Sequence, residues 1–150
     1  FHRYEVSAFS QDGRACRHNL NYWQFGDYLG IGAGAHGKIT NASRGTIHRY
    51  QKTRKPEDYL ANPEEARRQY QPVAEDDRLF EALMNGLRLV DGIRLQTVED
   101  NTGLPAAQWI KNLGELRQQG LLEITAQRLH CTDKGMHHLN GVLAKLAEAL

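Results

Sequence analysis

Residues 17–37, RHNLNYWQFGDYLGIGAGAHG, carry the strongest signals in this chain. A His-Asn pair leads to Tyr22 and Trp23, and an apolar segment then follows with glycines at Gly30, Gly32, Gly34 and Gly37. Glycine inside a strand often marks a place where a ligand or another backbone comes close. The pattern predicts a strand over residues 28–35 that forms one wall of a ligand pocket, with a histidine and two flat rings beside it.

Length and composition are those of an ordinary globular protein. The 150 residues suffice for one core or two small ones, and a net charge of +1 favours neither nucleic acid nor an anionic membrane as partner. There is no run of about 18 apolar residues and no signal peptide, and the chain starts without Met. We therefore expect no transmembrane segment, a cytoplasmic location, and the C-terminal part of a longer protein. Cys16 and Cys131 are too few for a disulfide framework or a zinc site.

The first half of the chain is expected to be rich in strands. Residues 4–9 alternate apolar and polar side chains as a strand does, and a turn signal follows at residues 11–13. Residues 38–55 are basic without one acid, as in a solvated loop, with a short strand at residues 46–50. Helix-start signals appear at Pro56–Leu60 and again at Asn62–Glu65. Pro72 is expected to break the segment that follows, which places a domain boundary near residues 70–76.

The second half has a helical period. Apolar residues with helical spacing begin after Asp76: Leu79, Phe80, Leu83, Met84 and Leu87. We expect a short helix from Thr97 to Gly103 and a longer one from Pro105 to Gln119 with its stop at Gly120. Two short strands at residues 121–124 and 128–131, and a final helix capped at Thr132, complete a winged-helix-like domain.

Several motifs have an ordinary structural explanation. The glycines do not form a phosphate loop, because Lys38 is followed by Ile39, and the formal GxGxxG match is not followed by a helix. Cys16 and His18 lack zinc spacing, and His137 and His138 point to different faces of a helix.

A lone His18 would by default bond backbone in a turn; Asn19, Tyr22 and Trp23 beside it favour binding. In the basic stretch, Arg44 and Arg49 are candidates for ligand carboxylates. Specific DNA binding is disfavoured, because residues 106–119 carry only Lys111 and Arg117 against Glu115.

HNLNYW followed by GIGAGAHG, together with YEVSAF and LHCTDKG, resembles the radical S-adenosylmethionine proteins related to oxygen-independent coproporphyrinogen III oxidase. The likeness is greatest to their haem chaperone branch and covers nearly the whole chain, as a C-terminal part. It implies an α+β fold in which residues 1–55 are the last strands of an incomplete TIM-like barrel. Residues 56–75 would then link this part to the winged-helix-like domain at residues 76–150.

The resemblance also implies site residues. In the chaperone branch the HNxxYW motif is associated with haem, which makes His18 a candidate haem contact or iron ligand, with Asn19, Tyr22 and Trp23 orienting it or stacking on the macrocycle. By position, S-adenosylmethionine would be held on the other side by Leu20, Asn21, Gly32, Ala33, Gly34, Ala35 and His36. The oxidase branch lacks this HNxxYW pattern and the histidine at position 36.

The family's four-iron, four-sulfur cluster motif CxxxCxxC is not found in the chain. Its ligands are expected upstream of residue 1, so the chain alone is not expected to be an enzyme. The expected partners are a tetrapyrrole, the N-terminal barrel portion and a haem-acceptor protein. Two alternatives stay open: part of a coproporphyrinogen III oxidase, which decarboxylates its substrate oxidatively, and a non-catalytic winged-helix interaction module.

Overall fold

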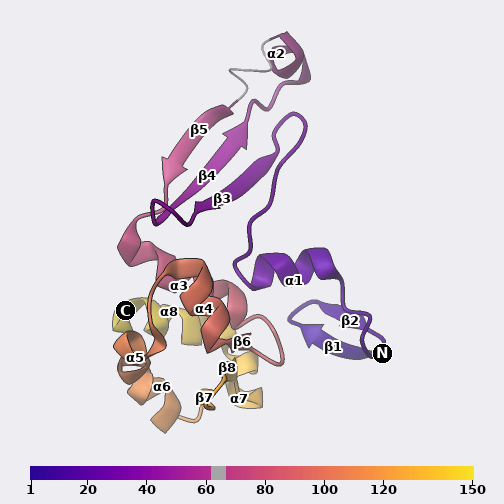
Figure 1. The fold of residues 1–150 in the computed structure, drawn as a ribbon. Coiled ribbons are helices and arrows are strands. Elements are labelled where there is room, and N and C mark those ends of the chain that lie inside the picture. Colours follow the sequence, from indigo (N-terminus) through magenta and orange to yellow (C-terminus); the bar gives the residue numbers. More distant parts are fainter. Residues whose placement is uncertain (62–66) are drawn as a thin grey trace. The chain divides into compact units, whose positions relative to one another are not determined.

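Short strands and short helices alternate along the chain in the computed structural model, which describes residues 1–61 and 67–150 (Figure 1). The helix start expected at Asn62–Glu65 lies outside the described residues. By their internal contacts the residues group into two compact units. Residues 1–25 and 75–150 form one, here called the helical unit, and residues 26–74 form the other, here called the sheet unit.

The helical unit begins with a hairpin of β1 (His2–Glu5) and β2 (Ala8–Ser10). The single strand expected over residues 4–9 is therefore wrong, because the chain turns at Val6 and Ser7. The turn is fixed from outside: the Val6 N–H donates to the Arg88 carbonyl over 3.0 Å. Alternation of side chains continues across such a tight turn, so the sequence pattern could not reveal it.

Helix α1 (Arg17–Trp23) follows the hairpin. Its end is anchored by Asn101, whose Nδ2 donates to the Gln24 carbonyl over 2.8 Å. Phe25 then turns the chain with a φ of 60°, in the left-handed region that side chains rarely adopt. Its ring is only 1% exposed, so burial in the core compensates for the strained backbone.

The rest of the helical unit consists of a helix, a short strand, a series of short helices, a hairpin and two closing helices. Its elements are α3 (Glu75–Gly86), β6 (Ile93–Arg94), α4 (Leu95–Thr102), α5 (Ala106–Trp109), a 3₁₀-helix (Ile110–Leu113), α6 (Gly114–Gln118), β7 (Leu122–Ile124), β8 (Arg128–Cys131), α7 (Asp133–His137) and α8 (Leu139–Ala149). The sheet has the order β6-β8-β7, with antiparallel pairs. The core of the unit is aliphatic and includes Leu83, Ile93, Val98, Leu113, Leu129 and Leu146.

Most helices expected in this region are confirmed. Gly103 and Gly120 end α4 and α6 with φ values of 77° and 65°. The Thr132 hydroxyl caps α7 by accepting from the Gly135 N–H over 3.0 Å. The one continuous helix expected from Pro105 to Gln119 is wrong, because a 3₁₀ turn separates α5 from α6.

The sheet unit has three strands in the order β3-β4-β5. They are β3 (His36–Asn41), β4 (Thr46–Lys52) and β5 (Arg67–Pro72), and helix α2 (Pro56–Ala61) lies between β4 and β5 in sequence. The short strand expected at residues 46–50 and the helix start at Pro56 are confirmed. The solvated loop expected over residues 38–55 is wrong, because most of this segment is paired in the β3–β4 hairpin.

The strand expected over residues 28–35 is also wrong. Only Tyr28 is paired, in an isolated bridge with Lys38, and the segment after it forms an irregular loop. Gly32 and Gly34 have φ values of 98° and 72°, which a strand cannot accommodate. The glycines therefore serve a loop rather than a strand.

The compact units differ from the domain limits suggested by the sequence. A change of unit at residue 75 lies close to the expected boundary, but residues 1–25 group with the C-terminal segment and not with residues 26–55. Contacts between β1 and the segment after α3 make this grouping, and they are distant in sequence. In the part of the chain that the structure describes, no helix is long and apolar enough to cross a membrane.

Candidate functional site

Helix α1 carries the HNLNYW residues on two different faces. Residues four positions apart share a face of a helix, so His18 pairs with Tyr22. Their ring centroids are 4.7 Å apart at an interplanar angle of 88°, an edge-to-face contact. His18 is exposed and Tyr22 is partly buried, so this pair forms the outer face of α1.

Asn19 and Trp23 form the inner face of the same helix. Asn19 Nδ2 donates to the Tyr4 hydroxyl of β1 over 3.1 Å. The Trp23 ring packs against the guanidinium of Arg88, whose Cζ lies 4.5 Å from the ring centroid. The inner pair thus fixes α1 to the rest of the helical unit, whereas the outer pair has His18 exposed and Tyr22 partly buried.

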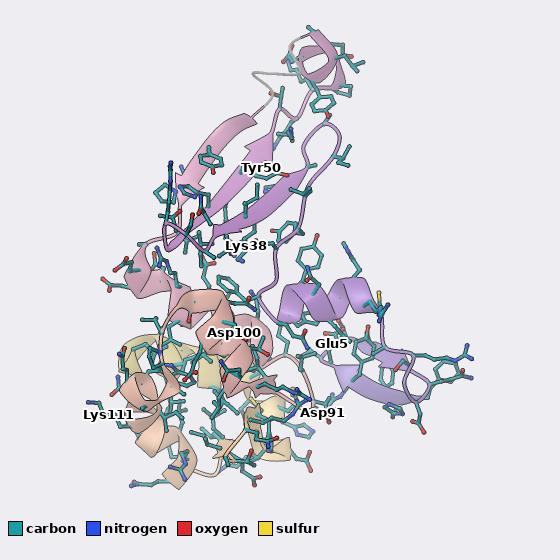
Figure 2. The ribbon with its side chains drawn as sticks, viewed as in Figure 1. Glu5, Lys38, Tyr50, Asp91, Asp100 and Lys111 are labelled. Carbon is teal, nitrogen blue, oxygen red and sulfur yellow. The ribbon has the colours of Figure 1, made fainter. Side chains whose placement is uncertain are left out.

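Several polar atoms beside the inner face are buried without a hydrogen-bond partner among the described residues. They are Trp23 Nε1, Arg88 Nε and one carboxylate oxygen of Glu5. Glu5, labelled in Figure 2, is only 1% exposed, and its other oxygen accepts from the Ser7 hydroxyl over 2.9 Å. Buried polar groups are nearly always paired, so unpaired atoms in one part of a fold are unusual.

The glycine-rich loop of the sheet unit is closed upon itself. A Cβ at Gly37 would lie 2.1 Å from the Tyr50 ring, and a Cβ at Gly30 would lie 2.0 Å from the His36 carbonyl oxygen. The Tyr50 hydroxyl accepts from the Gly30 N–H over 2.9 Å. Figure 2 labels Tyr50 on the sheet that carries this contact. The two glycines therefore allow one tyrosine to hold both ends of the loop.

The middle of the loop also uses its backbone internally. The Gly32 N–H donates to the Tyr59 hydroxyl over 3.3 Å, and the Gly34 N–H donates to the Thr53 carbonyl over 2.7 Å. The backbone is thus less open to a ligand than a bare strand would be. The loop instead exposes side chains to solvent: Ile31 is 88% exposed, and His36 is also exposed.

A charged clasp holds the start of this loop. Lys38 is 1% exposed, and its Nζ donates to Asp27 Oδ1 over 2.8 Å, while the Thr40 N–H donates to Asp27 Oδ2 over 2.7 Å. Partial burial acts to raise the pKa of Asp27, but the hydrogen bonds from Lys38 and Thr40 and the charge of Lys38 outweigh it and lower the pKa. The carboxylate is therefore charged at neutral pH.

The residues present do not fit an iron–sulfur cluster. The chain has only two cysteines, of which Cys16 is exposed and Cys131 is buried, and burial raises the pKa of the Cys131 thiol to about 11. Among the described residues no group of three or more His, Cys, Asp or Glu could hold a metal. A cluster held by cysteines would need ligands from another part of a longer chain.

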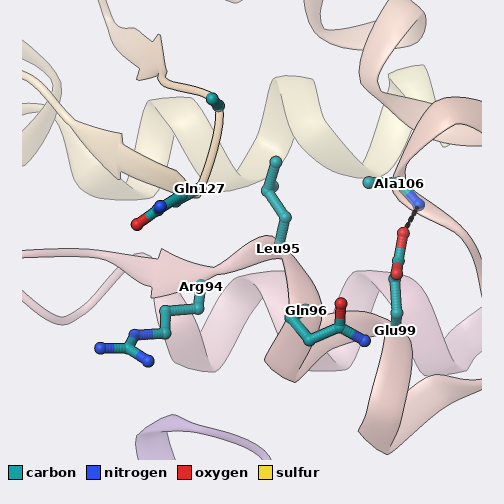
Figure 3. Close-up of a pocket in the computed structure, with 7 residues that line it drawn as sticks. Arg94, Leu95, Gln96, Glu99, Ala106 and Gln127 are labelled. Carbon is teal, nitrogen blue, oxygen red and sulfur yellow. Dashed lines mark hydrogen bonds between the residues drawn. The ribbon is translucent and has the colours of Figure 1, made fainter.

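A hollow of about 420 Å³ lies elsewhere in the helical unit (Figure 3). It is lined by Arg94, Leu95, Gln96, Glu99, Ala106, Ala126 and Gln127. Glu99, the carboxylate in this lining, accepts from the Ala106 N–H over 2.5 Å and so holds the start of α5. This role is structural, and none of the expected site residues lines the hollow.

The expected site residues are only partly brought together. His18, Asn19, Tyr22 and Trp23 share α1 with Leu20 and Asn21, whereas residues 32–36 belong to the sheet unit. Arg44 lies in the β3–β4 turn, and Arg49 contacts the Tyr28 hydroxyl at 3.4 Å. Sequence reasoning missed Arg88 and Tyr50, because each acts through a residue far away in the chain.

Comparison with known proteins adds independent information. Residues 73–138 match the model of the HemN C-terminal domain. Heme chaperone HemW of Haemophilus influenzae is 40% identical over 143 residues, which are 95% of this chain and 37% of that protein. Heme chaperone HemW of Escherichia coli is 39% identical, with the same shares covered. The chain thus spans 37% of the length of these relatives.

A mitochondrial protein and a solved enzyme structure are also similar to this chain. Radical S-adenosyl methionine domain-containing protein 1, mitochondrial, of Bos taurus is 33% identical over all of this chain and 36% of its own length. The solved structure of the radical SAM enzyme coproporphyrinogen III oxidase (HemN) from Escherichia coli matches the fold with a TM-score of 0.53 at 19% identity, over 83% of this chain and 29% of that one. Over 95% of its length this chain is thus similar in sequence to heme chaperones named HemW, and its residues 73–138 resemble the HemN C-terminal domain.

Proposed function

We propose that this chain is the C-terminal region of a radical S-adenosylmethionine haem chaperone and that the outer face of α1 binds the tetrapyrrole. One observation carries the proposal: His18 is exposed on a helix that is fixed to the fold through another of its faces. An iron ligand must present a free ring nitrogen on a rigid support, and imidazole is the commonest axial ligand of haem.

The four motif residues would have two kinds of role. His18 would contact the haem or ligate its iron, and Tyr22 would orient the imidazole through the edge-to-face contact. Asn19 and Trp23 would act from the inner face, Asn19 by holding α1 against β1. Stacking of Trp23 on the macrocycle is less favoured, because its ring already packs against Arg88.

The cofactor side of the site is proposed from the family. Leu20 and Asn21 on α1 and residues 32–36 of the loop would line the place of S-adenosylmethionine, with His36 the polar side chain of the loop that faces outward. A four-iron, four-sulfur cluster with that cofactor would supply radical chemistry in the full-length protein. Its ligands and most of an incomplete TIM-like barrel would lie in the part of the protein that precedes this chain.

The C-terminal segment is proposed to be a winged-helix-like domain. Its order of helices and strands, with β6 pairing with the second strand of the β7–β8 hairpin, agrees with that architecture. Within α6, Glu115 accepts a hydrogen bond from Lys145, which reduces the positive charge available to phosphates. A protein partner such as a haem acceptor, met in the cytoplasm, suits this surface better than nucleic acid.

The second candidate is part of a coproporphyrinogen III oxidase-like enzyme. The likeness to the solved oxidase supports it at the level of the fold. The matching chain portion would then hold the substrate tetrapyrrole, and His18 would have no iron to ligate. Oxidative decarboxylation by the full-length protein would favour this candidate over the chaperone.

A haem titration of the full-length protein, followed at the Soret band, tests the proposal. We expect saturable binding by the wild type and at least tenfold weaker binding by His18→Ala, because an axial ligand is lost. His138→Ala is the matched control, since His138 is equally exposed but lies after α7. Equal affinities of wild type and His18→Ala would reject α1 as the haem site.

A further inference from the structure

Arg88 is held beside the HNLNYW helix in an unusual state. Its guanidinium packs on the Trp23 ring at 4.5 Å from the centroid, and its backbone carbonyl accepts from the Val6 N–H of the hairpin. Cation–π packing of this kind fixes the plane of a guanidinium. The side chain thus lies where β1 and α1 pack together, next to the inner face of the proposed haem helix.

The charge of Arg88 is not neutralised by the fold. In the described residues Arg88 takes part in no ion pair and in no side-chain hydrogen bond, and its Nε is buried without a partner. The indole Nε1 of Trp23, in the ring that it contacts, is also buried without a partner. Two buried donors without acceptors on contacting side chains destabilise the fold, because each has given up its hydrogen bond to water.

We propose, on the basis of the function proposed above, that Arg88 is an anion-receiving residue that binds a carboxylate of the ligand held by α1. The side chain is only partly buried, and Nε is the one of its nitrogens that is buried without a partner, so we infer that the end of the guanidinium is left for a ligand while Cζ lies over Trp23. A planar fork of donors matches a carboxylate in two parallel hydrogen bonds. A tetrapyrrole with propionate groups supplies such a carboxylate, and so does the amino-acid end of S-adenosylmethionine.

Glu5 is the competing acceptor in this region. It is buried and has one unpaired carboxylate oxygen, yet it forms no ion pair with Arg88. A fold that used Glu5 to neutralise Arg88 would bring the two groups into contact, because a buried ion pair without contact gains little. The variant Glu5→Gln therefore tells whether Arg88 binds the ligand or Glu5. If Arg88 binds the ligand, the variant keeps the wild-type preference for a ligand with a free carboxylate.

The test compares haem with haem dimethyl ester, whose carboxylates are masked, in binding to the full-length protein. We expect the wild type to prefer haem by about 10- to 100-fold, the range for a hydrogen bond to a charged group. Arg88→Gln should lose this preference by binding haem as weakly as the ester, with its affinity for the ester unchanged. Arg88→Lys should keep part of it, because lysine retains the charge without the fork. Arg17→Gln, on the exposed start of α1, is the matched control.

The possible results show which ligand supplies the carboxylate, and they also show when the proposal fails. If Arg88→Gln weakens S-adenosylmethionine binding but not binding of its decarboxylated analogue, and leaves haem unaffected, the anion site stands with the cofactor as its ligand. If Arg88→Gln weakens haem and its ester equally, or changes no affinity, Arg88 only supports Trp23 and the inference is overturned. A wild type that binds no haem, or that binds it independently of His18, refutes the proposed function instead.

Discussion

At position 37 the absence of a side chain is a packing requirement. A methyl group there would lie 2.1 Å from the Tyr50 ring, which is buried and holds the Gly30 N–H. At position 141 a methyl group would meet nothing within 4 Å, although both residues are glycines inside regular elements. The same residue type thus has opposite sensitivity to substitution, according to what packs against it.

Gly37→Ala is expected to destabilise the protein by about 1–3 kcal/mol, because Tyr50 must move and its hydrogen bond to Gly30 weakens. Gly141→Ala in α8 is the control and is expected to be neutral or to stabilise by about 0.5–1 kcal/mol, since alanine favours helix. Urea denaturation of both variants measures the two effects. Equal stability of the two variants would show that the Tyr50 packing is wrong.

The two cysteines are expected to react differently with a maleimide at neutral pH. Cys131 is buried, and its pKa of about 11 keeps it as the unreactive thiol, whereas Cys16 is exposed before α1. Mass spectrometry of peptides from the labelled native protein should find the label on Cys16. Rapid labelling of Cys131 without denaturant would contradict its burial at the end of strand β8.

At the scale of single elements, the placement of α1 depends on contacts with its inner face. Asn19→Ala removes the hydrogen bond to Tyr4 and is expected to cost about 1 kcal/mol, the usual net value of such a bond. Because His18 lies on the other face, haem affinity should fall far less than in His18→Ala. Urea denaturation and a haem titration of the same variant measure both quantities. Equal haem losses in the two variants would mean that the faces are not separate.

The contacts of Asp27 with Lys38 and Thr40 are expected to make the stability of the sheet unit depend on pH. Since the pKa of Asp27 is lowered on folding, its charge stabilises the folded sheet unit above the unfolded pKa of 3.8. That stabilisation is lost as the pH falls through the lower, folded value. We expect Asp27→Asn to be less stable at pH 7 and to show a flatter decline in melting temperature between about pH 5 and 3. Parallel declines for variant and wild type would remove Asp27 as the group responsible.

At the scale of the whole molecule, each compact unit has a core of its own. Trp23 and Trp109, the two tryptophans of the chain, both belong to the helical unit, and residues 26–74 contain none. In a chain of residues 1–150, tryptophan fluorescence therefore reports unfolding of the helical unit. We expect Gly37→Ala to shift the transition followed by circular dichroism in part, and to leave the fluorescence transition in place. Identical shifts in both signals would mean that the chain unfolds as one unit.

The sequence predicted the C-terminal elements better than the N-terminal ones. Helices such as α3 are specified locally, because Leu79 and Leu83 recur at the helical period and Gly103 ends α4 with the φ that glycine permits. The loop after Tyr28 could not be predicted in this way. Alternating Gly and apolar residues suit a strand as well as a loop, and the choice depends on Tyr50 and Tyr59, which bind the loop from later in the chain.

The candidate site was found in part for the same reason. The residues His18, Asn19, Tyr22 and Trp23 were recognisable because they are neighbours in sequence, and their spacing on a helix follows from its period. Their division into an outer and an inner face was not, since it depends on Tyr4 and Arg88.

By itself the sequence determined the resemblance to haem chaperones, the periods of the C-terminal helices, the helix ends at Gly103 and Gly120 and the motif that marks α1. Only the tertiary structure decided which motif residues face outward, why Gly37 must lack a side chain, and that Arg88 lies on Trp23 without an ion pair to any residue that the structure describes. The physical reason is that period, turn geometry and motif spacing arise between near neighbours in the chain. Burial, close packing and charge compensation arise between residues far apart, such as Trp23 and Arg88, and exist only once the chain has folded.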